Sequence, residues 1–323
     1  MEPHEAIADR YRRFAAEEAR GSSPTYEQLA LAAAGSPRVL QFLATLPKER
    51  QQPNLFLAAI RLCAGTPSGS QSLESALGQH EQSIRQVMLT RTTQTNEAAR
   101  CAVLLPVLAR LEGPLALIEV GASAGLCLWP DRYAYQYGQT RLAPVSDATP
   151  APPVLECEAS ENTPLPQKLP SVAWRRGIDL NPLDVHSDRD MAWLEALIWP
   201  EHAARRERLR SAIAMAQQEQ TPVHKGDLLR DLPKLASHAP KDARLAVFHS
   251  AVLGYIPGQQ ARDRFADTVR ETGATWISNE VPRVYPWIAA KAGKAPKPGM
   301  FLLAVDGEPV AWTDPHGRSI HWL

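Results

Sequence analysis

The stretch that most constrains the fold is residues 115–126, which read LALIEVGASAGL. An apolar run reaches the acidic Glu119, and three small residues then follow at alternate positions, Gly121, Ser123 and Gly125. Residues 126–129 are apolar again and suit a helix. We therefore predict a buried strand, a tight turn and a helix N-terminus, an arrangement that brings backbone N–H groups close to a ligand.

The composition is that of a globular protein with a packed core. Of 323 residues, 44% are hydrophobic and 22% are charged, and 35 basic residues balance 35 acidic ones. This neutrality argues against broad binding to nucleic acid or to an anionic membrane. Four scattered cysteines without a CxxC pair predict reduced thiols and no metal site. With no signal peptide and no apolar run of the roughly 20 residues that span a bilayer, a cytoplasmic location is expected.

Two domains are predicted. Residues 1–112 read as an α-helical domain, with Pro53 at the first position of one helix. Residues 113–323 alternate strands with helices and form an α/β domain. Within it, residues 139–171 contain seven prolines, so we expect an irregular insertion there.

The α/β domain is predicted to be a doubly wound, mostly parallel sheet that ends in an antiparallel hairpin. After the first strand, further strands are expected at residues 133–137, 172–178, 222–224, 243–249, 274–278, 301–305, 310–313 and 319–322. The dipeptide Asp306-Gly307 is a hairpin signal. Helices between parallel strands place ligands at the carboxyl ends of the strands.

Three acidic residues fall at such ends, Glu119, Asp179 and Asp227. A carboxylate offers two acceptor oxygens to the adjacent hydroxyls of a ribose, which suits Asp179, and Asp227 would accept from an adenine amino group. Glu119 would repel a phosphate and attract a cationic ligand. The alternative for either aspartate is a helix N-cap.

Two further strand ends carry candidate catalytic groups, His249 and Glu280. Either would serve as a general base facing a substrate. The alternative for each is a strand-end side chain bonded to the backbone. Residues 184–188 have the spacing of metal ligands, but they lie before a helix, and capping is the better interpretation.

The turn also spells the G-x-S-x-G of a nucleophile elbow, with Ser123 as the nucleophile. Asp306 or Asp314 with His316 would complete a serine hydrolase triad. This interpretation assigns no role to Glu119, Asp179 or Asp227, and no oxyanion segment precedes the turn.

Several motifs together resemble an uncharacterised bacterial family, domain of unknown function 2332. They are EVGASAGL at 119–126, WPDRY at 129–133, GIDLNP at 177–182, WPE at 199–201 with Arg205, GD at 226–227 and HSAVLGY at 249–255. A more distant resemblance, over residues 115–315, is to class I S-adenosylmethionine-dependent methyltransferases, whose (Glu/Asp)-x-Gly-x-Gly-x-Gly turn has Ser123 here in place of its middle glycine. It implies a Rossmann-like core that holds S-adenosylmethionine through Glu119, Gly121, Ser123, Gly125, Asp179 and Asp227.

The leading expectation is methyl transfer from S-adenosylmethionine to a small molecule. An in-line approach of the acceptor to the sulfonium methyl needs mainly positioning, with His249 or Glu280 as the base if the acceptor is a hydroxyl or an amine. The alternative is a non-catalytic binding or assembly protein on a degenerate methyltransferase fold.

Overall fold

The computed structural model describes residues 3–94, 96–145, 151–219 and 223–323. The chain forms two compact units, residues 1–95 with 187–207 and residues 96–186 with 208–323. This division differs from a single boundary at residue 112. Helix α6 (Arg100–Leu108) belongs to the second unit, whereas a segment from the middle of the chain returns to the first.

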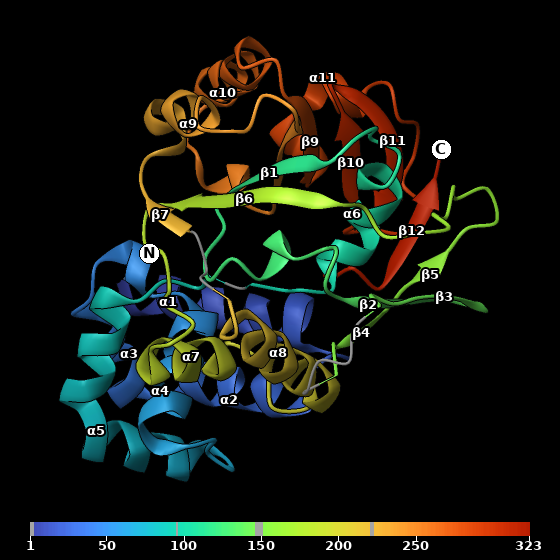
Figure 1. Cartoon of the computed structure of the whole chain (residues 1–323). Helices are drawn as coiled ribbons and strands as arrows, with labels where there is room; N and C mark the ends of the chain where they lie inside the picture. Colours follow the sequence, from blue (N-terminus) through green and yellow to red (C-terminus); the bar gives the residue numbers. More distant parts are fainter. Residues whose placement is uncertain (1–2, 95, 146–150, 220–222) are drawn as a thin grey trace. The chain divides into compact units, whose positions relative to one another are not determined.

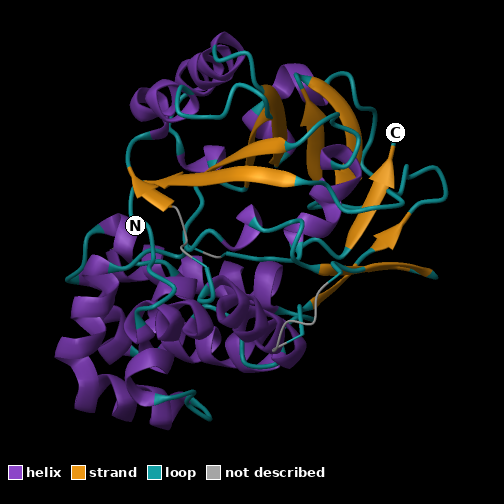
Figure 2. Cartoon of the chain, in the orientation of Figure 1, coloured by secondary structure: helices purple, strands orange, loops and turns teal. Residues whose placement is uncertain are grey.

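Helices make up the first unit (Figure 2). They are α1 (Pro3–Phe14), the π-helix η1 (Ala15–Ala19), α2 (Pro24–Gly35), α3 (Pro37–Ala44), the 3-10 helix η2 (Lys48–Arg50), α4 (Pro53–Ala64), α5 (Ser70–Thr90) and α7 (Asp188–Ala196). Helix α4 begins at Pro53, as predicted. Ser23 and Ser36 cap α2 and α3, because each hydroxyl accepts a backbone N–H from the first turn.

The returning segment, residues 187–207, is fixed to the N-terminal helices by polar contacts. The Trp193 indole N–H donates to the Thr92 carbonyl oxygen at 3.0 Å, and Arg91 pairs with Asp190 at 2.6 Å. These contacts join residues about a hundred positions apart, which explains why a contiguous boundary does not describe the units. Helix α8 (Ala203–Ala216) begins in the first unit and continues in the second.

The second unit is built on a nine-stranded, mostly parallel sheet, as predicted (Figure 1). Its strands lie in the order β5-β12-β11-β10-β9-β8-β1-β6-β7. Five of them are parallel neighbours: β7 (Val223–Lys225), β6 (Val172–Asp179), β1 (Leu115–Val120), β8 (Arg244–Ser250) and β9 (Thr275–Glu280). Of the expected strand at 222–224, Pro222 lies outside the described residues.

Antiparallel strands complete the sheet. They are β10 (Phe301–Val305), β11 (Glu308–Thr313) and β12 (Ser319–Trp322). The predicted hairpin is confirmed, since Asp306 (φ 51°) and Gly307 (φ 83°) both adopt the positive φ of a type I′ turn.

The proline-rich insertion contains more regular structure than expected. Its residues 146–150 lie outside the described part of the chain. Strands β3 (Thr140–Leu142) and β4 (Val154–Glu156) pair with β2 (Ala134–Tyr137) in a separate three-stranded sheet. The short β5 (Glu158–Ala159) joins the edge of the large sheet beside β12. The predicted strand at 133–137 therefore exists, but it does not belong to the main sheet.

Two helices pack on one face of the large sheet, α9 (Leu228–Ala236) and α10 (Gln259–Glu271). Leu232 and Phe265 belong to the same buried cluster as Val247 and Trp276 from the strands. Near β9 lie two short helices, the 3-10 helix η5 (Pro282–Val284) and α11 (Pro286–Ala289).

The predicted helix after the glycine turn is wrong. Residues 126–128 form only η3 (Leu126–Leu128), a single 3-10 turn. The side chain of Asn96 accepts the backbone N–H of Leu126 at 2.8 Å, and Pro130 follows two residues after the turn ends. This segment packs closely on β6, because a Cβ on Gly177 would lie 2.6 Å from the Ala122 methyl. The apolar run that suggested a helix is thus buried as irregular structure against the sheet.

Candidate functional site

The sheet has one point where its strand order reverses, between β1 and β8. From β1 the chain moves to β6 and β7 on one side, and then crosses to β8 and β9 on the other. Ligands of open α/β sheets bind in the crevice outside the carboxyl ends of the strands at such a point. A ligand site is therefore expected at the loops after β1 and β8 (Figure 1).

The backbone of the turn after β1 allows another segment of the chain to approach it closely. Gly121 and Gly125 both have φ 72°. A Cβ on Gly121 would lie 2.3 Å from Cγ2 of Val252, which belongs to the loop after β8. The glycine thus lets the two loops at the reversal point pack against each other.

Backbone strain is concentrated in these same two loops. Among the described non-glycine residues, only Ser123, Ala251 and Asp306 have positive φ. Asp306 is explained by its hairpin turn, whereas Ser123 (φ 53°) follows β1 and Ala251 (φ 59°) follows β8. Strain of this kind persists where the surrounding structure enforces it, and it clusters at binding sites.

Glu119 is buried at the end of β1, with 5% of its surface exposed. Burial raises the pKa of this carboxyl well above its usual range, and nearby Cys127 adds to the effect while the positive charge of Arg100 opposes it. Its Oε2 atom is enclosed without a hydrogen-bond partner, and so is the hydroxyl of Ser123. Two polar oxygens of the same turn therefore lack the bonds that buried polar groups normally make.

Asp179 ends β6 and meets the turn directly. Its Oδ2 accepts the Ser123 backbone N–H at 2.9 Å, and its Oδ1 accepts the Asn181 backbone N–H at 2.8 Å. The structure therefore brings Asp179 into contact with Ser123, in the turn that follows the strand of Glu119. Asp179 itself is half-buried.

Asp227 lies farther out, after the edge strand β7, and caps helix α9. Its Oδ1 accepts the backbone N–H groups of Leu229 at 2.8 Å and of Arg230 at 3.3 Å. Asp227 is thus the N-cap of α9, which was the alternative interpretation of this residue. Within the described residues its Oδ2 accepts no hydrogen bond.

His249 and Glu280 are brought together in a buried chain of hydrogen bonds, which occupies both ring nitrogens of His249 and Oε1 of Glu280. The Trp276 indole N–H donates to His249 Nε2 at 3.0 Å, and His249 Nδ1 lies 2.9 Å from Glu280 Oε1. Because an indole N–H can only donate, Nε2 must accept, and the imidazole is neutral with its proton on Nδ1. His249 is 0% exposed. Its geometry is that of a structural residue, with no lone pair free to act as a base.

Glu280 in turn holds the loop after β8. Its Oε1 also accepts the backbone N–H groups of Val252 at 2.9 Å and Leu253 at 3.1 Å. These residues lead into the 3-10 turn η4 (Leu253–Tyr255). The bonds fix the loop that packs on Gly121.

Arg100 is a residue that the sequence reasoning missed. It lies at the start of α6 with 7% of its surface exposed. Its Nε–H donates to the Pro315 carbonyl oxygen at 2.9 Å, and its Nη1 donates to the Ser250 carbonyl oxygen at 3.2 Å. A single charge inside the apolar run of residues 98–105 was the signal that could have found it.

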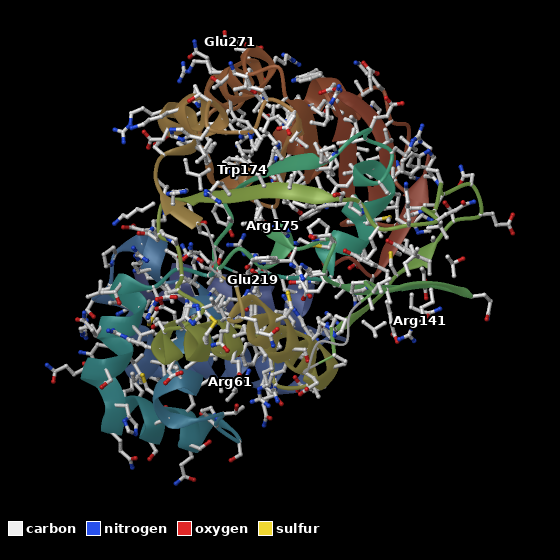
Figure 3. The ribbon with its side chains drawn as sticks, in the orientation of Figure 1. Arg61, Arg141, Trp174, Arg175, Glu219 and Glu271 are labelled. Atoms are coloured by element: carbon white, nitrogen blue, oxygen red, sulfur yellow. The ribbon has the colours of Figure 1, made fainter. Side chains whose placement is uncertain are left out.

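A second hollow, a groove of about 720 Å³, lies beside β6 in the same unit. The insertion and the end of α8 line it, with Arg141, Arg175 and Glu219 on its walls (Figure 3). Arg175 is already paired with Asp131 at 2.7 Å. Arg175 precedes Asp179 by four residues, about 13 Å along a strand, so the groove is separate from the turn after β1.

The other sequence candidates have structural explanations. Asp184 Oδ1 accepts the His186 backbone N–H at 2.9 Å, and Ser187 caps α7. The described part of the chain contains no cluster of three or more His, Cys, Asp or Glu side chains able to hold a metal ion. For a hydrolase, Ser123 would need a base, but its hydroxyl has no partner, and no helix follows it as the elbow requires. None of the described helices is long and apolar enough to cross a membrane.

Comparison with known families identifies the family to which the chain is similar. A model of the family described as uncharacterized protein conserved in bacteria (DUF2332) matches residues 8–322. The chain belongs to this family. The match covers nearly all of both units and confirms the resemblance inferred from the sequence motifs. Comparison with the curated proteins and with the solved structures yields no match.

Proposed function

We propose that this DUF2332 protein binds S-adenosylmethionine at the turn after β1 and transfers its methyl group to a small molecule. The observation that carries the proposal is the turn itself, where a strained serine and a buried glutamate each hold an oxygen without a partner, Ser123 Oγ and Glu119 Oε2. A ligand with polar hydrogens would satisfy both atoms.

The sheet topology supports a class I methyltransferase-like core. Numbered along the chain, the parallel strands β7-β6-β1-β8-β9 have the order 3-2-1-4-5 of a doubly wound nucleotide-binding sheet. The antiparallel strands β10 and β11 follow in place of a sixth parallel strand. The crevice at the carboxyl ends of such a sheet is where an adenosyl group is expected.

The residues at the crevice fit the parts of this cofactor. Glu119 would receive the ammonium of its methionine end, and that positive charge would favour the ionised carboxylate despite burial. Asp179 would accept from the ribose hydroxyls, and the remaining oxygen of Asp227 from the adenine amino group. Gly121 and Gly125 supply the positive φ angles of the turn, and Gly121 lets the loop after β8 pack against it. When bound, the cofactor supplies an electrophilic methyl group on sulfur.

The chain's own contribution to catalysis would be positioning rather than proton transfer. His249 and Glu280 are bonded to each other and hold the loop after β8 in place. We assign them to the support of the site, and the reaction would depend on orienting the acceptor in line with the methyl group.

A second candidate, a non-catalytic binding protein on the same fold, is favoured by one observation. The candidate base His249 is occupied at both ring nitrogens, since Nε2 accepts from Trp276 and Nδ1 is bonded to Glu280, whose Oε1 takes three hydrogen bonds. Binding of the cofactor without transfer to any acceptor in a metabolite mixture would support this candidate, and labelled methyl transfer would exclude it.

Titration calorimetry with S-adenosylmethionine and S-adenosylhomocysteine tests the proposal. Wild type should bind both. Asp179→Ala removes the carboxylate expected to accept two ribose hydroxyls, and a loss of about 2–3 kcal/mol corresponds to roughly 30- to 150-fold weaker binding. Asp184→Ala, which removes a carboxylate from a nearby turn of the same unit, is the matched control and should bind as wild type does. Wild type that binds neither ligand would refute the proposal.

A further inference from the structure

Arg100 is a buried charge without a counter-ion. Its guanidinium donates only to two carbonyl oxygens, those of Pro315 and Ser250. Across the described residues, no carboxylate lies within ion-pairing distance of it. Buried arginines are normally paired, because a charge removed from water must be compensated.

The guanidinium also has unused donors at the reversal point of the sheet. Of its five N–H groups, only those on Nε and Nη1 have acceptors in the described structure. The enclosed, unpartnered side-chain atoms include Glu119 Oε2 and Ser123 Oγ but no atom of Arg100. The Nη2 donors of Arg100 are therefore not sealed inside the protein.

The bonds of Arg100 place it between the elements that form the site. Ser250 ends β8, and the next residue is the strained Ala251. Arg100 also acts electrostatically on Glu119 at the end of β1. A positive group held at the end of β8 thus lies near a buried acid at the end of the neighbouring strand β1.

We infer that Arg100 receives the carboxylate of an α-amino-acid group whose ammonium faces Glu119. An α-amino-acid zwitterion carries one charge of each sign a few ångströms apart, which matches a guanidinium and a carboxyl set side by side. A guanidinium binds a carboxylate through parallel N–H···O bonds, so it fixes both position and orientation. The incoming carboxylate also supplies the counter-ion that Arg100 lacks.

This inference rests on the proposed function, because the α-amino-acid group has two sources there. One is the methionine end of the cofactor, and the other is an acceptor that is itself an amino acid. Both present the same chemistry to Arg100, so the experiment must separate them.

The test compares ligands with and without the amino-acid end, on wild type, Arg100→Gln and Arg100→Lys. S-adenosylhomocysteine carries the zwitterion, and 5′-methylthioadenosine keeps the adenosyl group but lacks the zwitterion. If the cofactor is the source, Arg100→Gln weakens S-adenosylhomocysteine roughly 10- to 100-fold while 5′-methylthioadenosine is unchanged. Arg100→Lys, which keeps the charge without the fork, recovers part of the loss.

If the acceptor is the source, S-adenosylhomocysteine binds wild type and Arg100→Gln equally. A second measurement, of thermal stability with an added amino acid, then distinguishes the two proteins. The wild-type complex with S-adenosylhomocysteine is then stabilised by glycine but not by glycinamide in a thermal melt, and Arg100→Gln loses this stabilisation. Arg208→Gln is the matched control, since it removes a largely buried arginine that is paired with Glu97 at 3.1 Å. It should not alter the preference for either ligand.

The outcomes separate the two proposals. Wild type that binds neither S-adenosylhomocysteine nor 5′-methylthioadenosine contradicts the proposed function. Wild type that binds them, with Arg100→Gln indistinguishable in both arms, leaves the proposed function intact and overturns the role of Arg100.

Discussion

Replacing Ser123 by glycine should make the protein more stable, although a buried side chain is lost. Ser123 adopts φ 53°, and its enclosed hydroxyl has no hydrogen-bond partner. The left-handed conformation costs a non-glycine residue roughly 1–2 kcal/mol. An unsatisfied buried hydroxyl costs about 1–3 kcal/mol. The added chain entropy of glycine in the unfolded state opposes these gains by about 0.5–1 kcal/mol.

The net gain is about 2 kcal/mol in the free energy of unfolding of the second unit. Urea denaturation followed by tryptophan fluorescence measures it, because Trp276 is buried in the core of this unit. Two further variants separate the contributions. Ser123→Ala removes only the hydroxyl and should gain about 1–2 kcal/mol. Ala251→Gly relieves only backbone strain and should gain about 0.5–1 kcal/mol.

A Ser123→Gly protein that is less stable than wild type would refute this reasoning. It would mean that the hydroxyl makes a stabilising contact in the free protein and that the turn is not strained. The same variant should bind S-adenosylhomocysteine several-fold more weakly, since the lost ligand hydrogen bond is worth about 1 kcal/mol. A stability gain with an affinity loss is the pattern expected of a residue retained for binding.

Three other substitutions test the packing and charges of the site. Because burial raises the pKa of Glu119 from 4.5, the unfolded chain binds fewer protons than the folded one between pH 4.5 and the raised pKa, and stability falls as pH rises through this window. Above pH 4.5, Glu119→Gln should therefore gain stability relative to wild type by at most about 1.4 kcal/mol per pH unit, and the difference should level off once the folded carboxyl has ionised, as measured by urea melts across pH. Gly121→Ala should cost roughly 2–4 kcal/mol because its Cβ would meet Val252, and a second change, Val252→Ala, should recover part of that loss in a double-mutant cycle. Trp276→Phe leaves the buried His249 Nε2 without a donor and should cost about 1–3 kcal/mol, whereas an unchanged melting temperature would contradict the assigned hydrogen bond.

The centre of the large sheet followed from local patterns because β1 and β8 contain short apolar runs bounded by turn residues. The hairpin at Asp306 and Gly307 was equally local, since both positions need positive φ. The segment after Gly125 misled the prediction for a physical reason. Apolar residues there are buried against β6 and Gly177 in irregular structure, and local patterns do not distinguish this from a buried helix.

The site could be predicted only as a set of strand ends. Sequence order places Glu119, Ser123 and Asp179 at one edge of the sheet, where the structure also has them, because neighbouring parallel strands end on the same side; their role in binding stays a prediction. It could not reveal that His249 is sealed by Trp276, or that Arg100 reaches the same edge. Those contacts join residues tens to hundreds of positions apart, and they depend on side-chain geometry rather than on any local pattern.

The crystal structure of the complex with S-adenosylhomocysteine is the most direct test of cofactor binding at the turn after β1. We predict electron density for the ligand at the turn after β1, with its ammonium near Glu119 and its ribose hydroxyls near Asp179. Density for the ligand elsewhere, or a turn left unchanged and empty at saturating concentration, would contradict it.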